Sequence, residues 1–248
     1  MATVDTTLAV PRASYLRAAR LFLVLLLTGD LVYLVMHVGH LTLPAFGGKH
    51  YSLETDRGLS EFYQYMKLLW LALCLAASFV QRRHWALLCW SGFFGVLLLD
   101  DALQFHERGG FWLGRQLGLP AVFGLRPDDF GELVVAAGIG GALATGLMLT
   151  LWRETGPVWR VSRELLVLTG LLAVFGVGVD AIHVIAYFRA PAFSTALAFL
   201  EDGGELLIIS AATAYALWIA LQGRQPSEGL RPLLLGGSSQ RRQTAGEA

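Results

Sequence analysis

Six long apolar stretches, separated by short polar segments, make up most of the chain. Each is 19 to 27 residues long, enough for a helix to cross the ~30 Å hydrocarbon core of a membrane. All eight prolines lie outside them, as expected where proline marks loops and helix ends. The pattern predicts an all-α polytopic integral membrane protein, a bundle of six transmembrane helices. The predicted spans are Arg20–Val38, Glu61–Phe79, Trp85–Phe105, Glu132–Trp152, Leu165–Phe188 and Thr195–Leu221.

Composition supports this class. Hydrophobic residues make up 55% of the chain and charged residues 15%, and the mean hydropathy is +0.55. Residues 1–222 are predicted to form one transmembrane domain, and residues 223–248 a polar, disordered tail. With the N-terminus inside, the inner segments hold twelve Arg and the outer segments six Lys or Arg. The positive-inside rule then places both termini in the cytoplasm and the chain in the cell membrane as a multi-pass protein.

Tryptophan, cysteine and net charge refine this picture. Five tryptophans fall near the inner interface and are interpreted as an aromatic belt. They are Trp85, Trp90, Trp152, Trp159 and Trp218. Cys74 and Cys89 lie within predicted spans and are interpreted as core residues, not as a disulfide. The net charge is zero and gives no reason to expect a nucleic-acid partner, whereas the preference for Arg over Lys favours a bacterial source.

Acidic residues recur at one depth of the predicted bundle. At about 1.5 Å rise per residue, four of them lie roughly 10 to 16 Å below the outer surface, each on a different helix. These are Asp30, Asp100, Asp180 and Glu205. Helical spacing adds His37 to the face of Asp30, His183 and Tyr187 to that of Asp180, and Glu201 to that of Glu205. The pattern predicts a polar cavity open to the outside.

Such a concentration of carboxylates needs compensation, because a charge in a membrane is costly and is usually functional. Lys67 is the only Lys or Arg at this depth, and it could neutralise Asp30 or Asp100 or extend outward. Protons or a bound cation must balance the remaining acids. Histidine favours a metal, because mixed imidazole and carboxylate ligands suit Zn, Mn or Fe.

The leading hypothesis is therefore a divalent metal ion bound by the deep groups, with Asp180 and His183 forming a carboxylate-x-x-His element. The predicted metal ligands are Asp30, His37, Asp100, Asp180, His183 and Glu205. Asp101, Glu201 and Tyr187 are the predicted catalytic or proton-handling residues.

Other acidic residues near the outer surface have a structural interpretation. Asp128, Asp129 and Glu132 precede the fourth span and Glu61 begins the second, so all four are interpreted as helix N-terminal groups. His106 and Glu107 fit either the site or interfacial water. In a regular helix His106 would be turned about 120° away from the face of Asp100.

Several functions remain open at this stage. A membrane-embedded, hydrolase-like enzyme, acting on a lipid or another small molecule, leads because the inner halves of the spans carry almost no polar residues. A proton- or cation-coupled transporter is the main alternative. A haem protein with axial His37 and His183 and a non-catalytic assembly subunit are the others. Membrane lipids are the expected partners, and the apolar segment Phe111–Leu125 is expected to lie in the interface or to cover the cavity.

Overall fold

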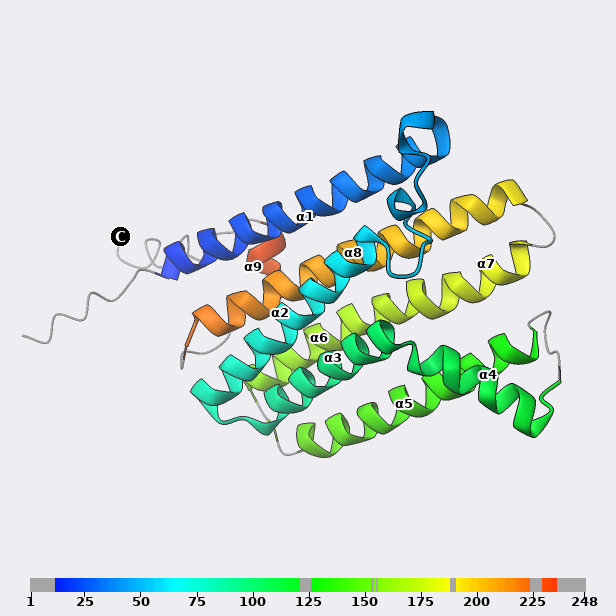
Figure 1. The fold of residues 1–248 in the computed structure, drawn as a ribbon. Coiled ribbons are helices and arrows are strands. Elements are labelled where there is room, and N and C mark those ends of the chain that lie inside the picture. Colours follow the sequence, from blue (N-terminus) through cyan, green and yellow to red (C-terminus); the bar gives the residue numbers. More distant parts are fainter. Residues whose placement is uncertain are drawn as a thin grey trace, which may run out of the picture.

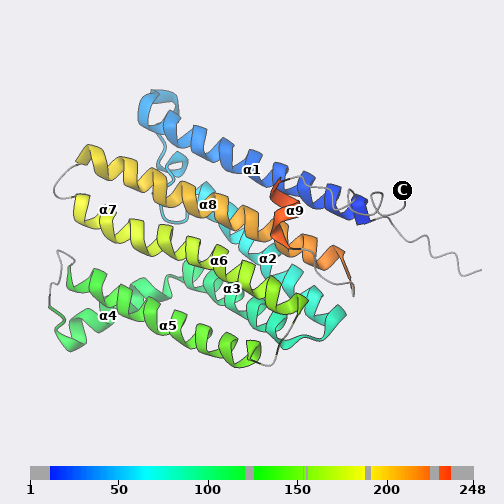
Figure 2. The same cartoon turned by 180° about the vertical axis from the view of Figure 1, so that it is seen from behind.

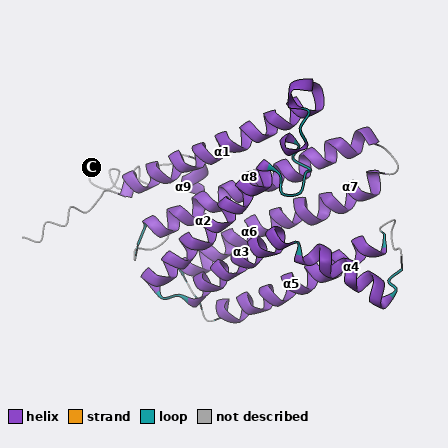
Figure 3. Ribbon diagram, in the orientation of Figure 1, coloured by secondary structure: helices purple, strands orange, loops and turns teal. Residues whose placement is uncertain are grey.

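Helices account for all regular secondary structure in the part of the chain that the computed structural model describes, which is residues 12–120, 126–152, 154, 156–187, 191–223 and 229–235 (Figure 3). The α-helices are α1 (Arg12–Thr42), α2 (Leu59–Arg82), α3 (Trp85–Leu103), α4 (Phe105–Leu117), α5 (Pro127–Leu151), α6 (Pro157–Ala173), α7 (Asp180–Tyr187), α8 (Pro191–Leu221) and α9 (Leu230–Leu235). Two short 3₁₀ turns, η1 (Pro44–Phe46) and η2 (Lys49–Tyr51), follow α1, and a π-helical segment, η3 (Val174–Val179), joins α6 to α7.

Six helices are long and apolar enough to cross a membrane, which confirms the predicted all-helical class with six candidate spans. They are α1, α2, α3, α5, the continuous rod formed by α6, η3 and α7, and α8. Pro127 and Pro157 occupy the first turns of α5 and α6, where a missing backbone N–H costs nothing.

The long helices form two layers (Figure 1). Seen from behind, α1, α8, the α6–α7 rod and α5 lie side by side, and α2 and α3 form the other layer (Figure 2). Helix α8 is central, because it packs against α1, α2, α6 and α7. Helix α4 turns aside after α3 and packs against α5.

A core of buried hydrophobic residues includes the part of the bundle where α3 begins and α8 ends. Trp90 and Phe94 of α3 meet Leu71 and Leu75 of α2 there, and all four are buried. Large aliphatic side chains instead face outward along the helices, for example Leu21, which is 61% exposed. Such an outer surface is typical of helices in contact with lipid.

The five tryptophans assigned to an aromatic belt at the inner interface are not all exposed. Trp85, Trp152 and Trp159 are exposed, as an interfacial belt requires. Trp90 and Trp218 are buried in the helix core, so the prediction that they join the belt is wrong. Depth along a helix can be read from sequence, but here the packing of α3 and α8 decides which side of the helix faces the core.

Asp30 and Lys67 form an ion pair between α1 and α2, and neither side chain exposes any surface. Lys67 Nζ lies 2.7 Å from Asp30 Oδ1, and it also donates to the Leu206 carbonyl (2.8 Å) and to Ser210 Oγ (3.1 Å). Ser210 Oγ donates in turn to Asp30 Oδ2 at 2.6 Å. Every Lys67 hydrogen therefore has an acceptor, and the pair connects α1, α2 and α8.

Part of the predicted disordered tail is helical. Residues 230–235 form α9, with Leu233 buried against the bundle. The backbone N–H of Leu230 donates to Glu164 Oε2 at 2.7 Å, and Arg20 donates to the Pro232 carbonyl. This correction arises from two long-range polar contacts that no local pattern reveals.

We expect Lys67→Met to lower the free energy of unfolding by about 3–5 kcal/mol, because it leaves Asp30 buried without a counter-charge. Asp30→Asn in the same chain should recover most of this loss. The measurement is thermal unfolding in detergent, which is monitored through the reactivity of the free thiols of Cys74 and Cys89. A double variant no more stable than Lys67→Met would contradict the assignment.

Candidate metal centre

A cavity of about 1440 Å³ runs between the two helix layers. Helices α2, α3, α5, α6, α7 and α8 all contribute to its wall. The acidic residues collect at the end where α3 and α7 finish, which we call the acidic end. Below them the wall is mainly apolar, with residues such as Phe93, Leu143 and Leu172. The sequence-based expectation of a cavity next to the deep carboxylates is therefore met.

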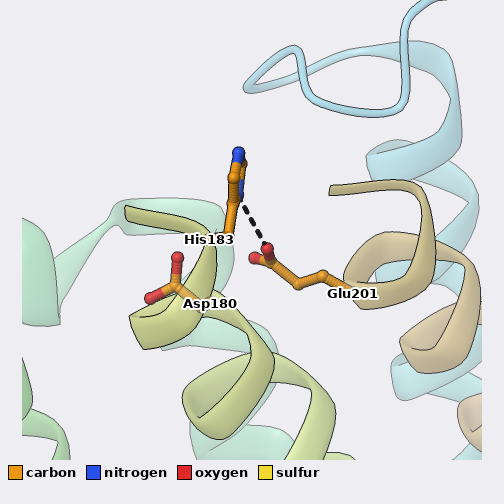
Figure 4. A group of neighbouring side chains, drawn as sticks. All are labelled: Asp180, His183 and Glu201. Carbon is orange, nitrogen blue, oxygen red and sulfur yellow. Dashed lines mark hydrogen bonds and ion pairs between the residues drawn. The ribbon is translucent and has the colours of Figure 1, made fainter. Parts of the chain in front are cut away.

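Asp180, His183 and Glu201 form a compact group at the acidic end (Figure 4). One potential ligand atom from each lies within 4.8 Å of the other two. His183 Nδ1 is 3.1 Å from Glu201 Oε2, and these side chains are 21% and 18% exposed. The Asp180 carboxylate has no hydrogen bond to any described residue. All three side chains line the cavity and so are accessible from it.

The π-helical segment η3 ends directly before Asp180. A π-turn adds a residue to a helical turn and changes the direction of the side chains that follow, and such turns often occur at functional sites. Gly176 within η3 leaves room for the Glu205 side chain of α8, because a Cβ at this position would overlap Glu205 Oε1. Gly204 on α8 similarly makes room for the ring of Phe175.

His106 and Asp100 form a second histidine–carboxylate pair in the cavity wall. His106 Nδ1 lies 2.9 Å from Asp100 Oδ2, and the backbone N–H of His106 donates to Asp100 Oδ1 at 3.0 Å. The expectation that His106 turns away from Asp100 is wrong, because α3 does not continue through Gln104. This residue has φ 55°, in the left-handed region, and the chain folds back there to begin α4.

Three other predicted or flanking carboxylates line the same cavity. Glu205 accepts a hydrogen bond from Gln64 Nε2 at 2.9 Å. The carboxylates of Asp101 and Asp202 form no hydrogen bond with a described residue. Asp100 and Glu205 thus share the cavity with Asp180 and His183 but do not belong to the compact group, whereas Glu201, predicted as a proton-handling residue, does.

Asp30 and His37 lie outside the cavity wall. Asp30 is paired with Lys67, as described above. His37 is fully buried, and its Nδ1 accepts a hydrogen bond from the backbone N–H of Leu53 at 3.1 Å. In the neutral ring the proton then resides on Nε2, which leaves no lone pair there for a metal. The side chain of Tyr187 lies outside the described part of the chain.

Glu132 lies in the cavity wall at the point where α4 and α5 cross closely. A Cβ on Gly110 would overlap the Glu132 backbone nitrogen, and one on Gly131 would overlap the Gly110 carbonyl oxygen. The two helices therefore touch through glycine, and Glu132 lines the cavity near His106.

The residues that sequence reasoning assigned to helix starts have two different roles. Asp129 does cap α5, because its carboxylate accepts from the backbone N–H of Arg126 at 3.0 Å and binds the guanidinium. That carboxylate also raises the pKa of Arg126 above its ordinary value. Glu61 has the predicted role at the start of α2 as well, because it accepts a hydrogen bond from the backbone N–H of Arg57. Asp129, Glu61 and Glu132 also line the cavity, as do Gln64 and Glu54, which sequence reasoning did not select. Gln64 could have been found from its spacing, since it lies three residues before Lys67 on α2.

The chain belongs to the family described as a domain of unknown function, DUF8692, whose model matches residues 18–219. The match extends from α1 to α8 and so includes the whole cavity. No curated protein and no solved structure matches the chain. Inference about function consequently rests on the chemistry of the site.

We expect Gly176→Ala to destabilise the bundle by about 1 kcal/mol, the low end of the cost of overpacking, because the new methyl group forces the end of the flexible Glu205 side chain to move. Gly178→Ala is the matched control, since a Cβ there meets nothing within 4 Å. Thermal unfolding of both variants in the same detergent tests the close approach. Equal unfolding temperatures for the two would show that Glu205 does not lie against η3.

Proposed function

We propose that this protein is a multi-pass membrane enzyme in which Asp180, His183 and Glu201 bind a divalent metal ion, Zn, Mn or Fe, and in which the reaction is a hydrolysis. The observation that carries the proposal is the convergence of one imidazole and two carboxylates, from two helices, on the wall of a cavity of about 1440 Å³. Six candidate spans and an aliphatic outer surface support the membrane location.

The donor set fits such an ion. Mixed nitrogen and oxygen ligands suit Zn, Mn and Fe, whereas Ca and Mg prefer oxygen alone. Two ligands of one Zn ion lie at most about 4 Å apart, so the 4.8 Å group needs to contract by only about 1 Å to hold one. His183 shares a proton with Glu201 through Nδ1, and an ion would compete with that proton.

The ion, when bound, would supply a Lewis acid and lower the pKa of a bound water. The chain itself provides groups that can hold and move protons nearby. Asp100 fixes the proton of His106 on Nδ1, which leaves the Nε2 lone pair as a proton acceptor. Asp101 adds a carboxylate without a hydrogen-bond partner among the described residues, and we assign it the role of general base alongside His106.

The first test is elemental analysis of the purified, detergent-solubilised protein by mass spectrometry. We expect near-stoichiometric Zn, Mn or Fe, and a loss of at least tenfold in metal content in His183→Ala, because one of three ligands is gone. His50→Ala is the control, since His50 is exposed and is not part of the cavity wall. Unchanged metal in a folded His183→Ala protein would exclude this group as the metal site.

A second candidate function, proton- or cation-coupled transport, is favoured by one observation. The cavity continues beyond the acidic end to Glu154 near the other end of α5. Between the two ends, Trp90 Nε1 and Thr169 Oγ1 are buried without a hydrogen-bond partner among the described residues, although both residues line the cavity. Water molecules bound to these atoms could extend a polar path along the cavity.

Proteoliposomes loaded with a pH-sensitive dye separate the two functions. An enzyme without a conduit should show no proton flux above that of empty liposomes when a pH gradient or a membrane potential is applied. Glu205→Gln serves as the comparison, because it removes one cavity carboxylate. A flux in the unaltered protein that this variant abolishes would make transport the function.

A further inference from the structure

The apolar part of the cavity has the dimensions of a lipid chain. On α5, every residue lining it from Leu133 to Leu151 is apolar or glycine, a distance of about 27 Å at 1.5 Å per residue. One leaflet of a membrane contributes about 15 Å of hydrocarbon. The wall below the acidic end can therefore hold a full acyl chain in contact with apolar side chains.

This part of the cavity opens sideways. Helix α5 packs on α4 and α3, while α6 and α7 pack on α8, and no extensive contact joins α5 to α6 or α7 among the described residues. Met148 on α5 and Leu166 on α6 line the cavity and are 70% and 44% exposed. If the bundle spans a membrane, the opening between these helices faces the lipid.

The negative charge at the acidic end determines which charge the head group of a ligand can carry. Twelve Asp and Glu residues line the cavity at this end, and Arg126 is the only Lys or Arg among the described lining residues. Arg126 is itself engaged by Asp129 at 2.6 Å. Where these carboxylates are ionised, a single divalent ion cannot balance them, so a cationic head is attracted and an anionic head repelled.

We propose that the ligand of this cavity is a membrane amphiphile with a protonated amine in its head, which enters between α5 and α6 and places its chain along the apolar wall. The inference rests on the proposed function and adds the class of substrate. An alkylamine stays protonated near neutral pH, as a lysine side chain does. Its ammonium group lies among the carboxylates next to Asp180, His183 and Glu201 when its chain follows α5.

Three probes of equal chain length test the selection by charge. They are hexadecylamine, hexadecanol and hexadecanesulfonate, each with a diazirine in the middle of the chain, added to the protein in phosphatidylcholine nanodiscs. After irradiation, mass spectrometry compares labelling of the cavity residues Leu143 and Leu172 with labelling of Leu21, an exposed position on α1. We expect the amine to exceed the sulfonate by about tenfold at the cavity residues and to match it at Leu21.

Two pairs of variants link the labelling to the cavity. Ala136→Trp places a bulky ring in the wall and should remove cavity labelling by the amine, whereas Ala137→Trp, on an exposed position outside the wall, should not. Asp101→Asn/Asp202→Asn should lower the preference for the amine at least threefold, because it removes two charges from the wall. The control for this loss of charge is the double variant Asp56→Asn/Asp128→Asn, which removes two charges at the same end of the bundle. Only Asp56 lies in the cavity wall, so this variant should lower the preference for the amine less.

Measuring metal in the same samples separates this inference from the proposed function. Selective labelling by the amine in a protein without metal would support the ligand class and overturn the metal-dependent enzyme. Metal in the Asp180–His183–Glu201 group together with equal labelling by amine and sulfonate would overturn the ligand class and leave the metal site in place. Cavity labelling that Ala136→Trp does not reduce would also overturn the proposal.

Discussion

Every buried charge among apolar helices needs a partner, and this requirement organises the structure. Desolvating a carboxylate is expensive, so a single Asp in a span is stable only beside a counter-charge or in contact with water. Asp30 meets the requirement through Lys67, and the pair also fastens α1 and α2 to the central helix α8. The other predicted deep carboxylates, Asp100, Asp180 and Glu205, have no Lys or Arg partner among the described residues and instead line one cavity. Asp30, which is paired with Lys67, thus holds the helices together, whereas the carboxylates around the cavity form the candidate site.

Close backbone contacts give the cavity its shape. Glycine allows α4 to cross α5 at Gly110 and Gly131, and at Gly176 it leaves room beside η3 for the Glu205 carboxylate of α8. By contrast, a Cβ at Gly138 or Gly146 on α5 would meet nothing within 4 Å. The small residues of α5 therefore do not bring it against another helix of the chain at these positions. The contact between α4 and α5 lies at the acidic end of the cavity, and α5 leaves the cavity open along the rest of its length at these glycines.

The sequence was sufficient for the class of fold and for part of the site. Hydrophobic run length is a local property, and it predicted the six long helices. Spacing along a helix grouped Asp180 with His183 and Glu201 with Glu205, and depth placed Asp180 and Glu205 in one layer. Of these residues, Asp180, His183 and Glu201 form the compact group. The errors arose where the backbone departs from a regular helix or where packing decides. Gln104 breaks α3, so the face of His106 could not be predicted from regular helical spacing. The hydrogen bond from the backbone N–H of Leu53 to His37, sixteen residues earlier, has no local pattern either, and His37 lies outside the cavity wall.

The π-helical segment before Asp180 makes the site depend on chain length rather than on residue identity alone. In a regular α-helix each residue advances the direction of the side chain by about 100°. Loss of one residue within Val174–Val179 would preserve the apolar character of the rod and both of its ends. It would nevertheless rotate Asp180 and His183 by about that angle relative to α6, away from Glu201. A one-residue difference in length at this position would therefore leave the bundle in place but take apart the Asp180–His183–Glu201 group.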